Sequence, residues 1–270
     1  RMLRVPEPFL DLRLFASRIF SGAVLVSLLT GYALATAIVG MAAFIDRVRF
    51  AGPEEQGVVL GPMAFFMAVG AFASGFLARR LDGTAVTIAG LVTSVVGLVW
   101  LSTTRIDTEL WVPVAALSLF GLGFGLPVTP RSMAAVEAAG RDAFGAASAA
   151  VTVARMAGMA IGMAVLTAFG TTRIDQTTQA LNDQAYRDSI LPTDLVGQPL
   201  ADPLVLDAIE RWASAEAAEV LGQLFIVAAI VLVIAAVPAW FMHDRRKPDG
   251  RAPKDAHAPA EVEEEALAGF

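Results

Sequence analysis

The stretch from Phe144 to Gly170 decides the fold of this chain, and it reads FGAASAAVTVARMAGMAIGMAVLTAFG. A helix rises about 1.5 Å per residue, so these residues span roughly 40 Å, enough to cross a hydrocarbon core of about 30 Å. Arg155 is the only charged residue in the stretch. It would lie roughly 16 Å from the Phe144 end. The stretch therefore predicts a transmembrane helix with a cation near its middle.

Small and polar residues share one face of this predicted helix with the arginine. They recur at three- and four-residue spacing and are Ser148, Thr152, Arg155, Gly158 and Gly162. Such a face favours close contact with another helix. A guanidinium in hydrocarbon costs about 3 kcal/mol or more unless it faces protein or water. Two roles stay open: Arg155 locks the bundle by pairing with carbonyls or a carboxylate, or it lines an aqueous cavity for substrate or coupling.

Five further runs are long and free of charge, and they are apolar on all sides, unlike a soluble amphipathic helix. The six predicted spans are residues 19–45, 56–78, 83–104, 110–130, 144–170 and 220–242. Hydrophobic residues make up 56% of the chain and charged residues 17%, below the charged share of about 25% in soluble domains. We therefore expect an all-α integral membrane protein with one six-helix bundle.

Three segments flank or interrupt the predicted bundle. Residues 1–18 are interpreted as a cytoplasmic linker that arrives from an upstream segment. Residues 171–215 mix charged and apolar residues at helical spacing and predict an extracytoplasmic helical loop, in which Asp202-Pro203 has the pattern of a helix start. Residues 243–270 are rich in Pro, Ala and Glu after a basic triplet and predict a disordered cytoplasmic tail.

The distribution of lysine and arginine predicts the orientation. With the N-terminus inside, the inside segments hold thirteen of these residues and the outside segments hold six. The thirteen include Arg131 and Arg141, which are assigned to the loop between the fourth and fifth spans. Cytoplasmic loops carry the excess of basic residues. Both termini are therefore expected in the cytoplasm of a multi-pass protein of the cell membrane.

Several kinds of active site lack the residues they need. The chain has no cysteine, and its two histidines, His243 and His257, lie in the predicted tail. None of the predicted spans contains Asp or Glu. A metal site or a hydrolytic centre would lack ligands or catalytic groups, and no basic patch suggests nucleic acid. We therefore expect neither an enzyme, nor a metal site, nor a cofactor, nor a nucleic-acid partner.

The loop between the second and third spans resembles a known family signature. It reads GFLARRLDG over residues 75–83 and contains Gly75, Arg79, Arg80, Asp82 and Gly83. This is similar to the loop of the major facilitator superfamily between the second and third helices of a six-helix half. The resemblance implies that the glycine lets two helices cross closely and that the basic residues join a cytoplasmic clasp. The chain departs from the pattern, because Arg79 replaces the family aspartate and Asp82 follows three residues later.

The fourth and fifth spans extend the resemblance. The fourth ends in a run that contains Gly121, Gly123, Gly125, Pro127 and Pro130. With the segment 144–170 and with PFLDLRLF at residues 8–15, this run resembles the C-terminal half of fourteen-helix drug:proton antiporters. The glycines and prolines either serve packing or form a hinge that bends the helix during alternating access. Gly158 and Gly162 would serve either.

The resemblance implies a transport function. We expect the C-terminal half of a secondary active transporter that exports amphipathic or lipophilic small molecules, driven by proton entry. Its partners would be a missing N-terminal half, the lipid bilayer, the substrate and protons, with the proton carrier in the missing half. The expected cavity residues are Arg155, Thr152, Ser148, Tyr32 and Thr36. The alternative is a self-contained six-helix structural or assembly subunit without transport activity.

Overall fold

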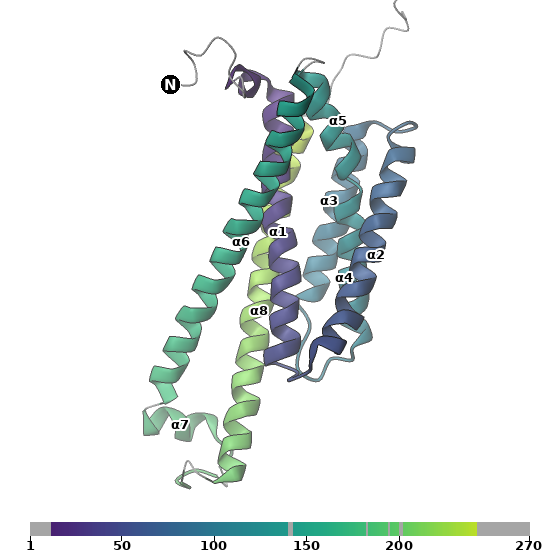
Figure 1. Cartoon of the computed structure of the whole chain (residues 1–270). Coiled ribbons are helices and arrows are strands. Elements are labelled where there is room, and N and C mark those ends of the chain that lie inside the picture. Colours follow the sequence, from purple (N-terminus) through teal and green to yellow (C-terminus); the bar gives the residue numbers. More distant parts are fainter. Residues whose placement is uncertain (1–11, 140–142, 182, 194, 200–201, 242–270) are drawn as a thin grey trace, which may run out of the picture.

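The computed structural model describes residues 12–139, 143–181, 183–193, 195–199 and 202–241 (Figure 1). Every regular element in these ranges is helical. The elements are the short 3-10 helix η2 (Leu12–Ala16), α1 (Arg18–Arg47), α2 (Pro53–Leu77), α3 (Gly83–Leu101), α4 (Trp111–Gly125), α5 (Val128–Ala139), α6 (Phe144–Leu181), α7 (Gln184–Ile190) and α8 (Pro203–Trp240). Six segments are long and apolar enough to cross a membrane, with α4 and α5 together forming one of them. The predicted all-helical architecture with six long apolar helices is confirmed. Most of the predicted linker and the whole predicted tail lie outside the described residues.

The helices form two groups that lie side by side (Figure 1). In one group α1 packs against both α6 and α8, and in the other α4 packs against both α2 and α3. The contact between α3 and α8 joins the groups, and α5 lies against α1 and α6. Helix α1 therefore occupies the centre of the first group, and it buries most of its apolar residues.

The crossing of α1 and α6 brings two backbones into direct contact. A side chain on Gly31 would overlap the carbonyl oxygen of Arg155, and a side chain on Gly158 would overlap that of Leu28. A Cβ on Gly162 would lie 2.7 Å from the carbonyl oxygen of Tyr32. The small face predicted around Arg155 is thus the face by which α6 contacts α1, because only glycine leaves room for such an approach.

Helix α4 is held between α2 and α3 by its own glycines. A side chain on Gly121 or on Gly125 would overlap backbone carbonyl oxygens of α2, and one on Gly123 would overlap the amide nitrogen of Ser94 on α3. The helix is interrupted at Leu126-Pro127, because proline lacks an N–H and its ring crowds the preceding turn. These glycines are therefore in close contact with neighbouring helices, while a hinge within the glycine and proline run stays a prediction.

Helix α5 continues the chain beyond the predicted end of the fourth span. Pro130 is the third residue of α5, within the first turn, where a missing N–H breaks no helical hydrogen bond. The helix therefore runs on to Ala139, and it carries Arg131 into the bundle, where the side chain is only 2% exposed. The assignment of Arg131 to a cytoplasmic loop is corrected. Twelve basic residues against six still favour the same orientation.

Helices α6 and α8 are much longer than a membrane span. Each has 38 residues, roughly 57 Å at about 1.5 Å per residue. Figure 1 shows both running past the ends of the other helices, with α7 near their far ends. Asp202 caps α8 by accepting a hydrogen bond of 2.9 Å from the amide of Leu204. Most of the predicted loop 171–215 is therefore a continuation of two spanning helices.

Helix α7 is linked to α8 by two aromatic rings. Tyr186 of α7 and Trp212 of α8 meet edge to face, with ring centroids 6.0 Å apart. Val205, near the start of α8, is 1% exposed, so the described part of this segment has a small apolar core of its own. Edge-to-face pairs contribute about 1 kcal/mol beyond the burial of their area.

Candidate functional site

Arg155 lies on α6 at the crossing with α1. Its backbone carbonyl faces Gly31, and its side chain is half-buried. Among the described residues no carboxylate pairs with the guanidinium and no hydrogen bond engages it. The described residues therefore supply no ion-pair partner for Arg155, and its two predicted roles, a structural lock and a cavity-lining cation, both stay open.

The predicted hydroxyl residues near Arg155 are engaged within their own helices. Thr152 donates a hydrogen bond of 3.0 Å to the carbonyl oxygen of Ser148, and both residues are half-buried. Thr36 is 1% exposed and donates to the carbonyl oxygen of Tyr32 at 3.0 Å. The structure brings Tyr32 to Gly162 of α6. Arg155 and Tyr32 thus lie at the crossing of α1 and α6, while Thr152 and Ser148 lie on α6 one and two turns before Arg155.

Arg131 is a second intramembrane cation that the sequence interpretation missed. Its Nη1 donates a hydrogen bond of 2.7 Å to Thr30 Oγ1 on α1, and its Nε has no hydrogen-bond partner within the described ranges. The charge of Arg155 acts on it by Coulombic repulsion. Since Thr30 precedes Gly31, both arginine-bearing helices meet α1 at the same turn. The available signal was the run of helix formers after Pro130, in which four alanines occur among nine residues.

No anion among the described residues balances these two cations. The ion pairs found there are Arg49 with Glu55 and Arg211 with Asp207, neither of which involves Arg131 or Arg155. Glu137 on α5 is exposed rather than turned towards the arginines. A single neutral acceptor offsets little of the free energy that it costs to remove a guanidinium from water. The α1–α5–α6 junction is therefore a cationic centre suited to an anionic group.

The loop between α2 and α3 departs from the crossing implied by the family resemblance. A Cβ on Gly75 would meet no atom within 4 Å, so the described helices do not cross closely there. Asp82 caps α3 by accepting from the amide of Thr84 at 3.3 Å. The Arg80 guanidinium lies 4.7 Å from the centre of the Phe76 ring. Of the predicted motif residues, Gly83 is in contact with another helix, with its Cβ position 3.3 Å from Pro130.

Comparison with known proteins places the chain in a family. Residues 3–163 match the family described as Major Facilitator Superfamily. The chain belongs to the major facilitator superfamily. It is therefore a multi-pass membrane protein of a transporter family and not an enzyme, as the sequence predicted.

The relatives of this chain carry transporter names. It is 32% identical to a triacylglyceride transporter of Mycolicibacterium hassiacum over 248 residues, which covers 85% of this chain and 44% of that protein. It is 32% identical to a triacylglyceride transporter of Mycolicibacterium smegmatis, covering 82% and 40% of the two chains. Multidrug resistance protein 3 of Bacillus subtilis is 25% identical, with 90% and 49% covered. The chain spans less than half the length of these relatives.

Proposed function

We propose that this chain is the C-terminal six-helix half of a secondary active transporter that exports amphipathic or lipophilic molecules in exchange for protons. The observation that carries the proposal is the match to triacylglyceride transporters over most of this chain but less than half of theirs. The similarity to a multidrug resistance protein supports a lipophilic substrate, and the run of glycines and prolines in α4 and α5 supports the likeness to fourteen-helix antiporters.

The missing half would cover the exposed faces of α2 and α6. These two helices are the least buried of the six candidate spans. Their exposed side chains are large and apolar, and they include Phe65, Phe66 and Phe72 on α2 and Val153 and Met156 on α6. Substrate would bind near the midplane between the two halves, where transporter sites are typically formed. Arg155 would line that cavity together with Ser148, Thr152 and Tyr32, while Thr36 would support Tyr32 from within α1.

Proton coupling requires a group that this chain does not place inside its predicted spans. These spans hold no Asp or Glu, and the described bundle adds two arginines at the α1–α5–α6 junction. The proton carrier would therefore be a carboxylate of the N-terminal half, held close to the cationic centre.

The isolated chain should accordingly show no substrate-linked proton movement. It would be reconstituted in liposomes containing a pH-sensitive dye, beside the full-length protein, and challenged with a lipophilic dye or a labelled triacylglyceride. The full-length protein should acidify or alkalise the lumen when substrate is added, and this chain should not. Robust flux from the chain alone would contradict the proposal that the proton carrier lies in the N-terminal half. Absence of flux from the full-length protein as well would contradict proton-coupled export.

The orientation makes a second prediction. With both termini cytoplasmic, the exposed Ser189 on α7 lies outside the cell and Ala256 in the tail lies inside. The chain has no cysteine, so Ser189→Cys and Ala256→Cys can each be labelled alone with an impermeant thiol reagent. Intact cells should label the first variant only, and permeabilised cells should label both. Labelling of Ala256→Cys but not Ser189→Cys in intact cells would reverse the orientation.

A further inference from the structure

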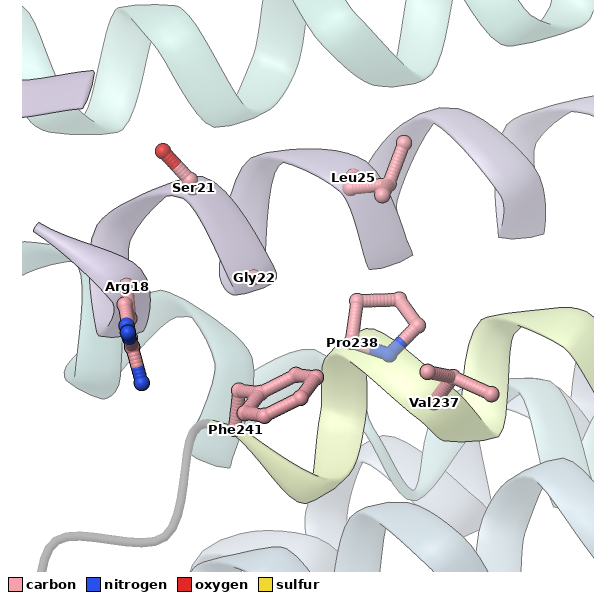
Figure 2. A pocket seen from close by; sticks show the side chains of 7 residues that line it. All are labelled: Arg18, Ser21, Gly22, Leu25, Val237, Pro238 and Phe241. Carbon is pink, nitrogen blue, oxygen red and sulfur yellow. The ribbon is translucent and has the colours of Figure 1, made fainter. Parts of the chain in front are cut away.

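A groove lies where the first turns of α1 meet the last turns of α8 (Figure 2). It is lined by Arg18, Ser21, Gly22, Leu25, Val237, Pro238 and Phe241. Both helices are candidate membrane spans, and these are the ends that the orientation places at the cytoplasmic surface. The groove therefore opens where lipid head groups meet acyl chains.

The lining of the groove is almost entirely apolar, and its one charged residue, Arg18, stands at one end. Figure 2 shows Arg18 and Phe241 at one end and Leu25 beyond Gly22 towards the other. Leu25 lies two turns further along α1, roughly 10 Å deeper at about 1.5 Å per residue. Leu25 is 45% exposed and Val237 is 60% exposed, so both present apolar surface to the groove. The cation is at the membrane surface and the apolar wall lies below it. This order is complementary to a phospholipid, whose phosphate lies at the surface and whose acyl chains lie below.

The cation at the rim is accessible from outside the described residues. Arg18 is exposed, and within the described ranges no carboxylate pairs with it. The positive end of the α1 dipole lies at the same place, because α1 begins at Arg18. Trp240 is largely exposed beside Phe241, and aromatic residues of this kind mark the membrane interface.

We propose that this groove binds an anionic phospholipid of the cytoplasmic leaflet, with its phosphate at Arg18 and an acyl chain along Leu25 and Val237. Charge complementarity selects this occupant, because a zwitterionic lipid would bring its own cation to the rim. A helix of the upstream half could cover the apolar wall but would offer the arginine no phosphate. The cytoplasmic leaflet is also where anionic lipids concentrate. The proposal concerns a surface away from the α1–α5–α6 junction and does not depend on transport.

The selectivity is tested by native mass spectrometry of the full-length protein titrated with phosphatidylglycerol or phosphatidylcholine. Wild type should prefer phosphatidylglycerol, and Arg18→Gln should reduce that preference about five-fold, the effect of one basic residue near an anionic surface. Arg18→Lys should retain it, since a point charge suffices for a phosphate. The matched control is Arg47→Gln at the opposite end of α1, which should leave the preference unchanged. Equal binding of both lipids to wild type, or the same loss in Arg47→Gln, would overturn the proposal.

The occupant is identified by a photo-crosslinking amino acid at Val237, in the apolar wall. Irradiation in membranes that contain phosphatidylglycerol should attach a lipid to the residue, and Arg18→Gln should lower the yield. Attachment to the protein's own upstream residues would show that another helix fills the groove, and it would overturn the proposal. This readout is independent of efflux, so its failure can be told apart from a failure of the proposed transport function.

Discussion

Replacing Arg155 with alanine should abolish or strongly reduce efflux by the full-length transporter while its abundance in the membrane stays normal. Insertion should not suffer, because removing a charge from the middle of a span favours insertion by about 3 kcal/mol on translocon scales. The crossing with α1 should also persist, because the contact at Gly31 is made by the carbonyl of residue 155 and not by its side chain. The expected loss of efflux would therefore come from removing the charge that is proposed to face the other half.

Arg155→Lys should restore efflux only in part, because an ammonium cannot reproduce the planar fork that a guanidinium offers to a carboxylate. The matched control is Arg173→Ala, on the same helix, where the guanidinium lies 5.7 Å from the centre of the Phe169 ring. Abundance and efflux would be measured on the same cells. Loss of the protein from the membrane would indicate a structural arginine whose acid partner is left buried. Wild-type efflux in Arg155→Ala would remove this residue from the mechanism.

The features of the fold that could be predicted from sequence are those set by neighbouring residues. Six long apolar runs can satisfy their backbone in hydrocarbon only as helices, so their existence follows from composition. The spacing of Gly158 and Gly162 indicates a face for close contact, and the structure places α1 against it. Asp202-Pro203 is a local start signal, and α8 begins there with Asp202 as its cap.

The features that could not be predicted depend on partners far along the chain. Pro130 has the pattern of a helix end, and only its place in the first turn of α5 lets the helix continue. The burial of Arg131 requires Thr30, which is 101 residues away, and no local pattern reports that contact. Gly75 shows the opposite case, since its motif implies a close crossing that the described helices do not make.

Thr30→Val should destabilise the protein by about 2 kcal/mol, the contribution of a buried hydrogen bond to a charged group. Valine keeps the shape of threonine but removes the one acceptor that the described residues offer the Arg131 guanidinium. The matched control is Thr87→Val on α3. That threonine is fully buried, and its hydroxyl donates to the Gly83 carbonyl of its own helix at 2.9 Å. The control should cost much less, as measured by thermal unfolding of the full-length protein in detergent.

If the proposed carboxylate of the N-terminal half lies beside Arg155 and not beside Arg131, Arg131→Met should leave stability unchanged or raise it, by up to about 4 kcal/mol. The substitution then replaces a buried charge, which has no opposite charge among the described residues, by an apolar side chain of similar length. In that background Thr30→Val should cost almost nothing, so the double-mutant cycle should give a coupling of about 2 kcal/mol. A loss of about 3–5 kcal/mol in Arg131→Met would instead mean that the N-terminal half supplies an acid to this arginine. The cycle therefore distinguishes stabilisation of Arg131 by Thr30 alone from stabilisation by an acid of the N-terminal half. If the coupling is confined to Thr30, Arg131 is held by α1 alone. The positive charge of Arg131 then repels that of Arg155, and an anion beside Arg155 would relieve this repulsion.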